Sequence, residues 1–148
     1  MEVRNLKIST KGRYALRVMI DLAEHDGGAY IPLKEIAERQ EISEKYAEAI
    51  ISVLVKADVL RGVRGKGGGY KLAHPPESYT VGRILKLTEN GLAPVSCLES
   101  SPNRCPRAAE CKTLPMWTEL GRRIDEYLES VTIADLAFGD AAADSYMI

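Results

Sequence analysis

Residues 59–72 read VLRGVRGKGGGYKL, and this stretch decides the fold. Two short runs of strand-forming residues, 59–64 and 70–72, flank a glycine-rich tip, a pattern that predicts a β-hairpin. Between Leu60 and Lys71 there are four basic residues and no acidic residue. A flexible, basic tip is suited to approach phosphates or to enter a minor groove. The glycine run could instead cradle a nucleotide, but it precedes a strand and lacks a Gly-Lys-Ser/Thr ending.

Two helices joined by a short turn are predicted before the hairpin. The first covers about 32–40, and the second begins at the N-cap candidate Ser43 after the turn 40–42. A glycine is usual in such a turn, and Glu41 occupies that position. The apolar face of the second helix consists of Tyr46, Ile50, Val53, Leu54 and Ala57.

These elements predict a winged helix-turn-helix domain over 7–76, with the helix-turn-helix over about 33–56 and the wing over about 60–72. An earlier helix, capped near Ser9 and ending near His25, completes it. Residues 1–71 hold 13 Lys and Arg against 10 Asp and Glu, whereas residues 72–148 hold 7 against 11. The front part thus has the charge balance of a nucleic-acid contact surface.

The second half predicts a helix capped by Thr80, a loop, a long helix over about 115–130 and a short final helix after Thr132. The fold class is therefore mainly α with a small β-hairpin. The long helix has an apolar stripe made of Trp117, Leu120, Ile124, Tyr127, Leu128 and Val131. This stripe needs a partner surface, and homodimerisation is the simplest source, although the helix could fold back on its own domain. We expect residues 80–138 to form the dimerisation part and residues 139–148 to form a flexible tail.

Bulk composition is that of an ordinary globular domain of 148 residues. The sequence contains no run of 18 or more apolar residues, so no membrane span is predicted. The charged N-terminus shows no secretory signal. We therefore expect a cytoplasmic location and no membrane partner. Thiols stay reduced in that compartment.

All three cysteines, Cys97, Cys105 and Cys111, fall within fifteen residues of the expected loop. An odd, clustered set in a reducing compartment favours metal ligation or redox sensing. An iron–sulfur cluster takes such thiolates. A zinc site is an alternative, although the Cys-x2–4-Cys pair common in zinc sites is missing. A second alternative is a thiol redox switch, activated by nearby basic residues. The last alternative is that the three thiols bind no ligand.

The chain resembles the IscR-type family of winged-helix regulators, which includes IscR, NsrR and CymR, from about residue 7 to 136. The resemblance is carried by STKGRYA at 9–15, PLKEIA at 32–37, VRGKGGGY at 63–70, TIADL at 132–136 and the three-cysteine loop. It is closest to IscR. The resemblance implies a homodimer that binds a double-stranded DNA operator and holds a [2Fe–2S] or [4Fe–4S] cluster on the loop cysteines.

The resemblance also assigns DNA-facing positions. Ser43, Lys45, Tyr46 and Glu48 match positions of the family's third helix, and Arg64 matches a wing arginine that reaches the minor groove. Lys66, at the wing tip, is expected to contact phosphates. Ala49 stands where IscR has a glutamine, so the same operator preference does not follow.

The fourth cluster ligand is open. Leu114 stands where IscR has a histidine, and Arg13 stands where NsrR-like members have a carboxylate. The candidates are Glu99, Asn103, Glu110, a partner residue or a small exogenous ligand.

The sequence disfavours two other function classes. An enzyme is not expected, because no nucleophile elbow, zincin motif or paired-histidine motif occurs. A winged-helix adaptor for protein contacts is disfavoured by the basic, acid-free wing.

Overall fold

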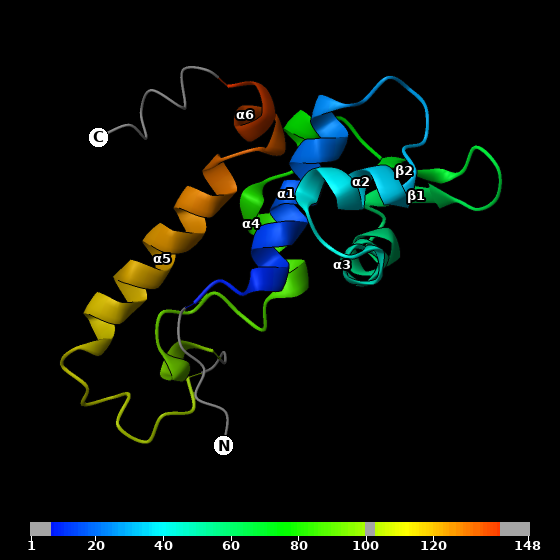
Figure 1. Ribbon diagram of the computed structural model, residues 1–148. Coiled ribbons are helices and arrows are strands. Elements are labelled where there is room, and N and C mark those ends of the chain that lie inside the picture. Colours follow the sequence, from blue (N-terminus) through cyan, green and yellow to red (C-terminus); the bar gives the residue numbers. More distant parts are fainter. Residues whose placement is uncertain (1–6, 100–102, 140–148) are drawn as a thin grey trace.

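The computed structural model describes residues 7–99 and 103–139. Within them the chain forms six α-helices and one two-stranded antiparallel sheet, which confirms the expected fold class (Figure 1). The helices and strands are α1 Thr10–Glu24, α2 Leu33–Gln40, α3 Glu44–Lys56, β1 Leu60–Val63, β2 Gly69–Leu72, α4 Val81–Thr88, α5 Leu114–Ser130 and α6 Ile133–Phe138, with single 3-10 turns at Pro76–Ser78 and Ser96–Leu98. Beyond Gly139, the expected tail lies outside the described residues.

Four helices begin at hydroxyl N-caps, as the sequence predicts. The side chains of Ser9, Ser43 and Thr80 each accept a backbone N–H three residues on, at 3.0 Å. Thr132 and Asp135 form a reciprocal capping box at the start of α6. These caps satisfy orphan donors of the first helical turn locally, so they set where each helix starts.

The wing is tied to the body through Ile31. Strands β1 and β2 pair from Leu60 with Leu72 to Val63 with Gly69. Ile31 exchanges two backbone hydrogen bonds with Tyr70, at 2.9 and 2.8 Å. Gly69 has φ of 149°, and a Cβ there would collide with the Ile31 backbone, so only glycine permits this close approach. The base of the wing is thereby held at the start of α2.

One hydrophobic core is shared by both halves of the chain, because α1 packs against α6 and α4 as well as α2 and α3. Tyr79 is fully buried, and its hydroxyl donates to the Val59 carbonyl at 2.9 Å. The core contains Ala15, Val18, Met19, Leu22, Ala23, Ile31, Ile36, Ile50, Ile51, Leu54, Val59, Leu60, Tyr79, Ile84 and Ile133.

The buried face of α3 differs in detail from the expected one. Ile50 and Leu54 are buried as predicted, whereas Tyr46 and Val53 are only half-buried. Ala47 and Ile51 are buried instead. The face turned to the core is therefore rotated toward these two residues, and Ala47, Ile50, Ile51 and Leu54 follow the i, i+3, i+4, i+7 spacing of one helical face.

Helix α5 extends away from the body, and α6 returns the chain to α1 (Figure 1). None of the α5 residues is buried. The helix is held by polar contacts to α4, where Lys86 Nζ lies 2.7 Å from Asp125 Oδ1 and 3.0 Å from Glu129 Oε1. Across residues 7–99 and 103–139, no helix has both the length and the apolar character needed to cross a membrane.

Candidate nucleic-acid interface and cysteine loop

The N-terminal turns of α3 present the expected DNA-facing residues. Ser43, Lys45 and Glu48 are exposed, as is Ala49. Tyr46 is half-buried, because its ring stands edge-on against Tyr14 of α1 with centroids 5.9 Å apart. The Tyr14 contact holds the Tyr46 side chain in place while leaving part of it accessible.

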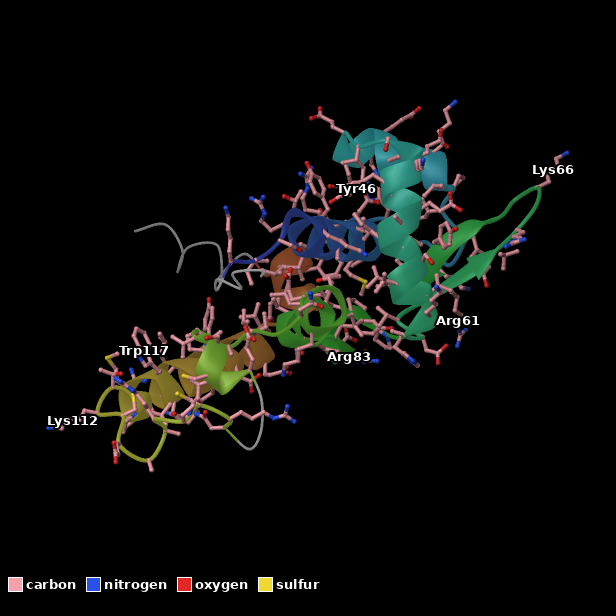
Figure 2. All side chains as sticks on the ribbon, turned by 90° about the horizontal axis from the view of Figure 1, so that it is seen from below. Tyr46, Arg61, Lys66, Arg83, Lys112 and Trp117 are labelled. Atoms are coloured by element: carbon pink, nitrogen blue, oxygen red, sulfur yellow. The ribbon has the colours of Figure 1, made fainter. Side chains whose placement is uncertain are left out.

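The wing carries the other two expected residues. Arg64 and Lys66 are exposed, and Lys66 lies at the outermost point of the hairpin (Figure 2). Gly65 and Gly67 have positive φ angles of 93° and 78°. The tip turn is closed by a hydrogen bond from Gly68 N to the Gly65 carbonyl at 2.9 Å.

A groove of about 300 Å³ lies between α3 and the wing. It brings together Glu48 and Arg64, which are distant in sequence. Lys45 and Lys66 do not line it. Its walls are Glu48, Ser52, Val55, Lys56, Gly62, Val63, Arg64 and Tyr70. Ser52 and Lys56, which sequence reasoning did not single out, thus belong to the same surface, since they lie one and two turns after Glu48 on α3.

The cysteine loop lies at the opposite end of the molecule, near Lys112 and Trp117 (Figure 2). Cys97 is in the 3-10 turn Ser96–Leu98, the Cys105 backbone N–H donates to Asn103 Oδ1 at 2.8 Å, and Cys111 precedes α5. All three thiols are free and partly buried. Three thiols are the donor type that iron–sulfur clusters use.

A metal site also requires that the ligand side chains lie close to one another. Among the residues that the structure describes, no three His, Cys, Asp or Glu side chains gather in a way that could hold a metal ion. The loop therefore offers thiols of the type that a cluster binds, without a set of described side chains that converges on one metal position.

Cys111 has its own local chemistry. Its Sγ lies 3.3 Å from Thr113 Oγ1, and this hydrogen bond lowers the pKa of the Cys111 thiol. It also lines a shallow cavity of about 390 Å³ with Arg107, Glu110 and Lys112. A lowered pKa increases the thiolate fraction, which both metal binding and thiol chemistry require.

A polar network below the helix-turn-helix was missed by sequence reasoning. Asp21 of α1 is the buried charged residue of the core, only 2% exposed, and it accepts hydrogen bonds from Arg39 and Gln40 of α2. The Asp21 carboxylate raises the pKa of the Arg39 guanidinium. The available signal was an acidic residue inside an apolar helical stripe, between Met19 and Leu22.

Comparison with known proteins gives a consistent result. The family model described as "Rrf2: Iron-dependent Transcriptional regulator" matches residues 8–138. The chain is 40% identical to Protein rrf2 of Nitratidesulfovibrio vulgaris, over 88% of this chain and 87% of that protein. It is 37% identical to the HTH-type transcriptional regulator CymR of Bacillus subtilis, over 96% and 98% of the two chains.

Solved structures agree with this. The structure of CymR, described as the global cysteine regulator of B. subtilis, matches with a TM-score of 0.72 and 37% identity, covering 88% of this chain and 95% of that one. The T. potens IscR structure matches with a TM-score of 0.71 and 37% identity, covering 96% and 92%.

Proposed function

Because this chain belongs to the Rrf2 family of transcriptional regulators, of the IscR and CymR type, we propose that it regulates transcription as a homodimer that senses through its three cysteines. Its relatives are named as transcriptional regulators and not as enzymes. Beyond membership in the family, we propose which residues contact DNA, which group the cysteines bind and which helix forms the dimer contact.

In the proposed complex α3 enters the major groove and the wing reaches the neighbouring minor groove. This arrangement is supported by the protein groove between α3 and the wing, which Glu48 and Arg64 both line. Ser43 and Lys45 are exposed on α3 beside this protein groove, and Lys66 is exposed on the wing. The DNA backbone that separates the major groove from the minor groove would then pass through the protein groove between α3 and the wing. Ser52 and Lys56 line this protein groove and are suited to phosphate contacts.

The wing gives a direct test of DNA reading. Arg64→Ala should weaken binding to the specific operator by roughly 1–3 kcal/mol, because an arginine in a narrow groove reads shape. Lys66→Ala should weaken binding to all sequences alike and slightly flatten the salt dependence, because a phosphate contact carries no sequence information. Fluorescence anisotropy on operator and random duplexes over a salt series measures both. Unchanged binding in both variants would contradict the wing assignment.

For the cysteine loop we propose an iron–sulfur cluster held by Cys97, Cys105 and Cys111. Supporting observations are the three thiols on one loop, the lowered pKa of Cys111 and the iron-dependent description of the matching family. When bound, the cluster would give the loop a group that can be oxidised or lost. The loop connects α4 with α5, so its occupancy can bias how the two DNA-reading heads are spaced.

A thiol switch is a second candidate for the same loop. It is favoured by the hydrogen bond between Cys111 and Thr113 and by the nearby Arg107 and Lys112. The similarity to CymR, a cysteine regulator, is compatible with it.

Anaerobic purification separates the two candidates. The cluster proposal predicts a visible absorption band with bound iron and sulfide and without zinc, and a variant with all three cysteines changed to Ala should lose all of these. That variant should also differ from the loaded protein in operator affinity or site preference. Identical DNA binding by the two proteins would contradict sensing through the cysteines, and iron-free protein with reversible thiol oxidation would favour the switch.

For the homodimer we propose that α5 is the contact helix. Its large apolar side chains Met116, Leu120 and Tyr127 are 54%, 39% and 52% exposed. A second copy of the same helix would cover them in an isologous contact. In this arrangement residues 7–76 read DNA, and residues 80–138 carry the cysteine loop and the dimer contact.

A further inference from the structure

The buried carboxylate of Asp21 is the starting point of a hydrogen-bonded relay that leads to the surface. Its oxygens accept from Arg39 Nε at 2.9 Å, from Arg39 Nη2 at 2.8 Å and from Gln40 Nε2 at 2.9 Å. An ionised carboxylate only accepts hydrogen bonds, so the Gln40 amide must turn its NH₂ group toward Asp21. Its oxygen is then left on the opposite side.

The side-chain oxygen of Gln40 accepts a hydrogen bond from a second residue of α1. Arg17 Nε donates to Gln40 Oε1 at 2.8 Å, and Arg17 Nη2 donates to the Gln40 carbonyl at 3.3 Å. A flipped Gln40 amide would point its NH₂ at a guanidinium, which has no acceptor. Asp21 therefore determines, through Gln40, which group Arg17 meets.

The Arg17 guanidinium is also held from one face. Its Cζ lies 4.6 Å from the centre of the Tyr14 ring, and that ring contacts Tyr46 in the first turns of α3. Arg17 is nevertheless exposed. In the part of the chain that the structure describes, its Nη1 group makes no hydrogen bond. The side chain is thus an exposed cation that Gln40 and Tyr14 hold beside α3.

We propose that Arg17 binds a DNA phosphate next to the N-terminal end of α3, and that Asp21 and Gln40 are positioning residues for it. The free Nη1 group of the guanidinium can donate a charge-assisted hydrogen bond to a phosphate oxygen. Because protein contacts already hold the side chain, less conformational entropy is lost when the phosphate arrives. This inference rests on the proposed DNA-binding function and adds a contact from α1 to it.

The main test is the salt dependence of DNA binding by Arg17→Gln. Loss of one phosphate contact should reduce the slope of log K against log salt concentration by about 0.9. Affinity at low salt should fall on the order of tenfold for operator and random duplex alike, because the contact is to the backbone. Arg123→Gln, on exposed α5 far from α3, is the matched charge control and should keep the wild-type slope.

The relay is tested by Gln40→Leu. This change leaves the pair of hydrogen bonds between Asp21 and Arg39 in place, so thermal unfolding should show a folded protein. Affinity should fall to a value between those of wild type and Arg17→Gln, because the charge stays but its anchor is lost. Adding Gln40→Leu to Arg17→Gln should then cost little more.

The outcomes separate this inference from the function on which it rests. If the wild-type protein binds DNA and Arg17→Gln keeps its slope, the phosphate contact is wrong and the proposed DNA-binding function stands. If Gln40→Leu weakens binding equally with and without Arg17, the relay is wrong. If the wild-type protein shows no salt-dependent DNA binding at all, the proposed function itself fails.

Discussion

Glu41 occupies the turn between α2 and α3 with φ of 56° and ψ of 44°, in the left-handed region. Its backbone N–H bonds the carbonyls of α2 and so ends that helix. The helix-turn-helix was recognisable although glutamate replaced the usual glycine, because the spacing of the flanking apolar residues was intact. A glutamate with positive φ is strained, and the packing around the turn has to offset the strain.

Glu41→Gly should therefore stabilise the protein by up to about 1 kcal/mol, because glycine adopts this conformation without a Cβ clash. The free energy of unfolding in urea measures the change. The control, Glu38→Gly, lies inside α2 and should destabilise by about 1 kcal/mol, since glycine weakens a helix interior. Destabilisation by both substitutions would show that the turn is not strained.

At the scale of elements, the joint between α4 and α5 is polar. Glu129 of α5 accepts from Lys86 and from the Thr80 hydroxyl, at 3.0 and 2.8 Å. The bond to Lys86 is the larger cause and the Thr80 bond the second cause of a lowered pKa at Glu129. Hydrogen bonds to Asp125 and then to Glu129 raise the pKa of Lys86. We therefore expect the stability of the joint between α4 and α5 to depend on the protonation of Glu129 and Lys86.

The sign of the pH dependence follows from these directions. Glu129 contributes stability that is present above its unfolded pKa of about 4.3 and is lost as pH falls through its lower folded value. Lys86 contributes stability that is lost as pH rises through its raised folded value. In urea unfolding across pH 3–6, Glu129→Gln should show a flatter fall of stability with acid than the wild type, and Lys86→Met should flatten it similarly. Wild-type slopes in both variants would mean that the joint adds nothing measurable.

At the scale of the whole molecule, α5 exposes the large apolar side chains of Met116, Leu120 and Tyr127, and none of its residues is buried. The stripe recognised in the sequence is present, and Trp117, Ile124 and Leu128 are half-buried. Part of the stripe is thus covered within the chain, since α5 also lies against Pro94 and Leu98 near Gly121, whereas Leu120 and Tyr127 stay exposed. A second copy remains the proposed partner.

Leu120→Asp should convert the proposed dimer into a monomer, because a carboxylate would be buried without a partner at the contact. The molar mass measured by light scattering checks this. Val63→Asp is the matched control, since Val63 on the wing is 47% exposed and lies away from α5. A monomeric wild type, or a dimeric Leu120→Asp variant, would contradict dimerisation through α5.

The sequence by itself determined the helix caps, the short turn around Glu41, the glycine-rich wing and the thiol donor set. Each of these is decided within a few residues, by a side chain that bonds its own backbone or by a backbone angle. Only the tertiary structure decided that Ala47 and Ile51 face the core, that Glu48 and Arg64 share a groove and that Leu120 and Tyr127 of α5 stay exposed. It alone connected Asp21 through Gln40 to Arg17. These features depend on packing between segments distant in the chain, for which local periodicity carries no information.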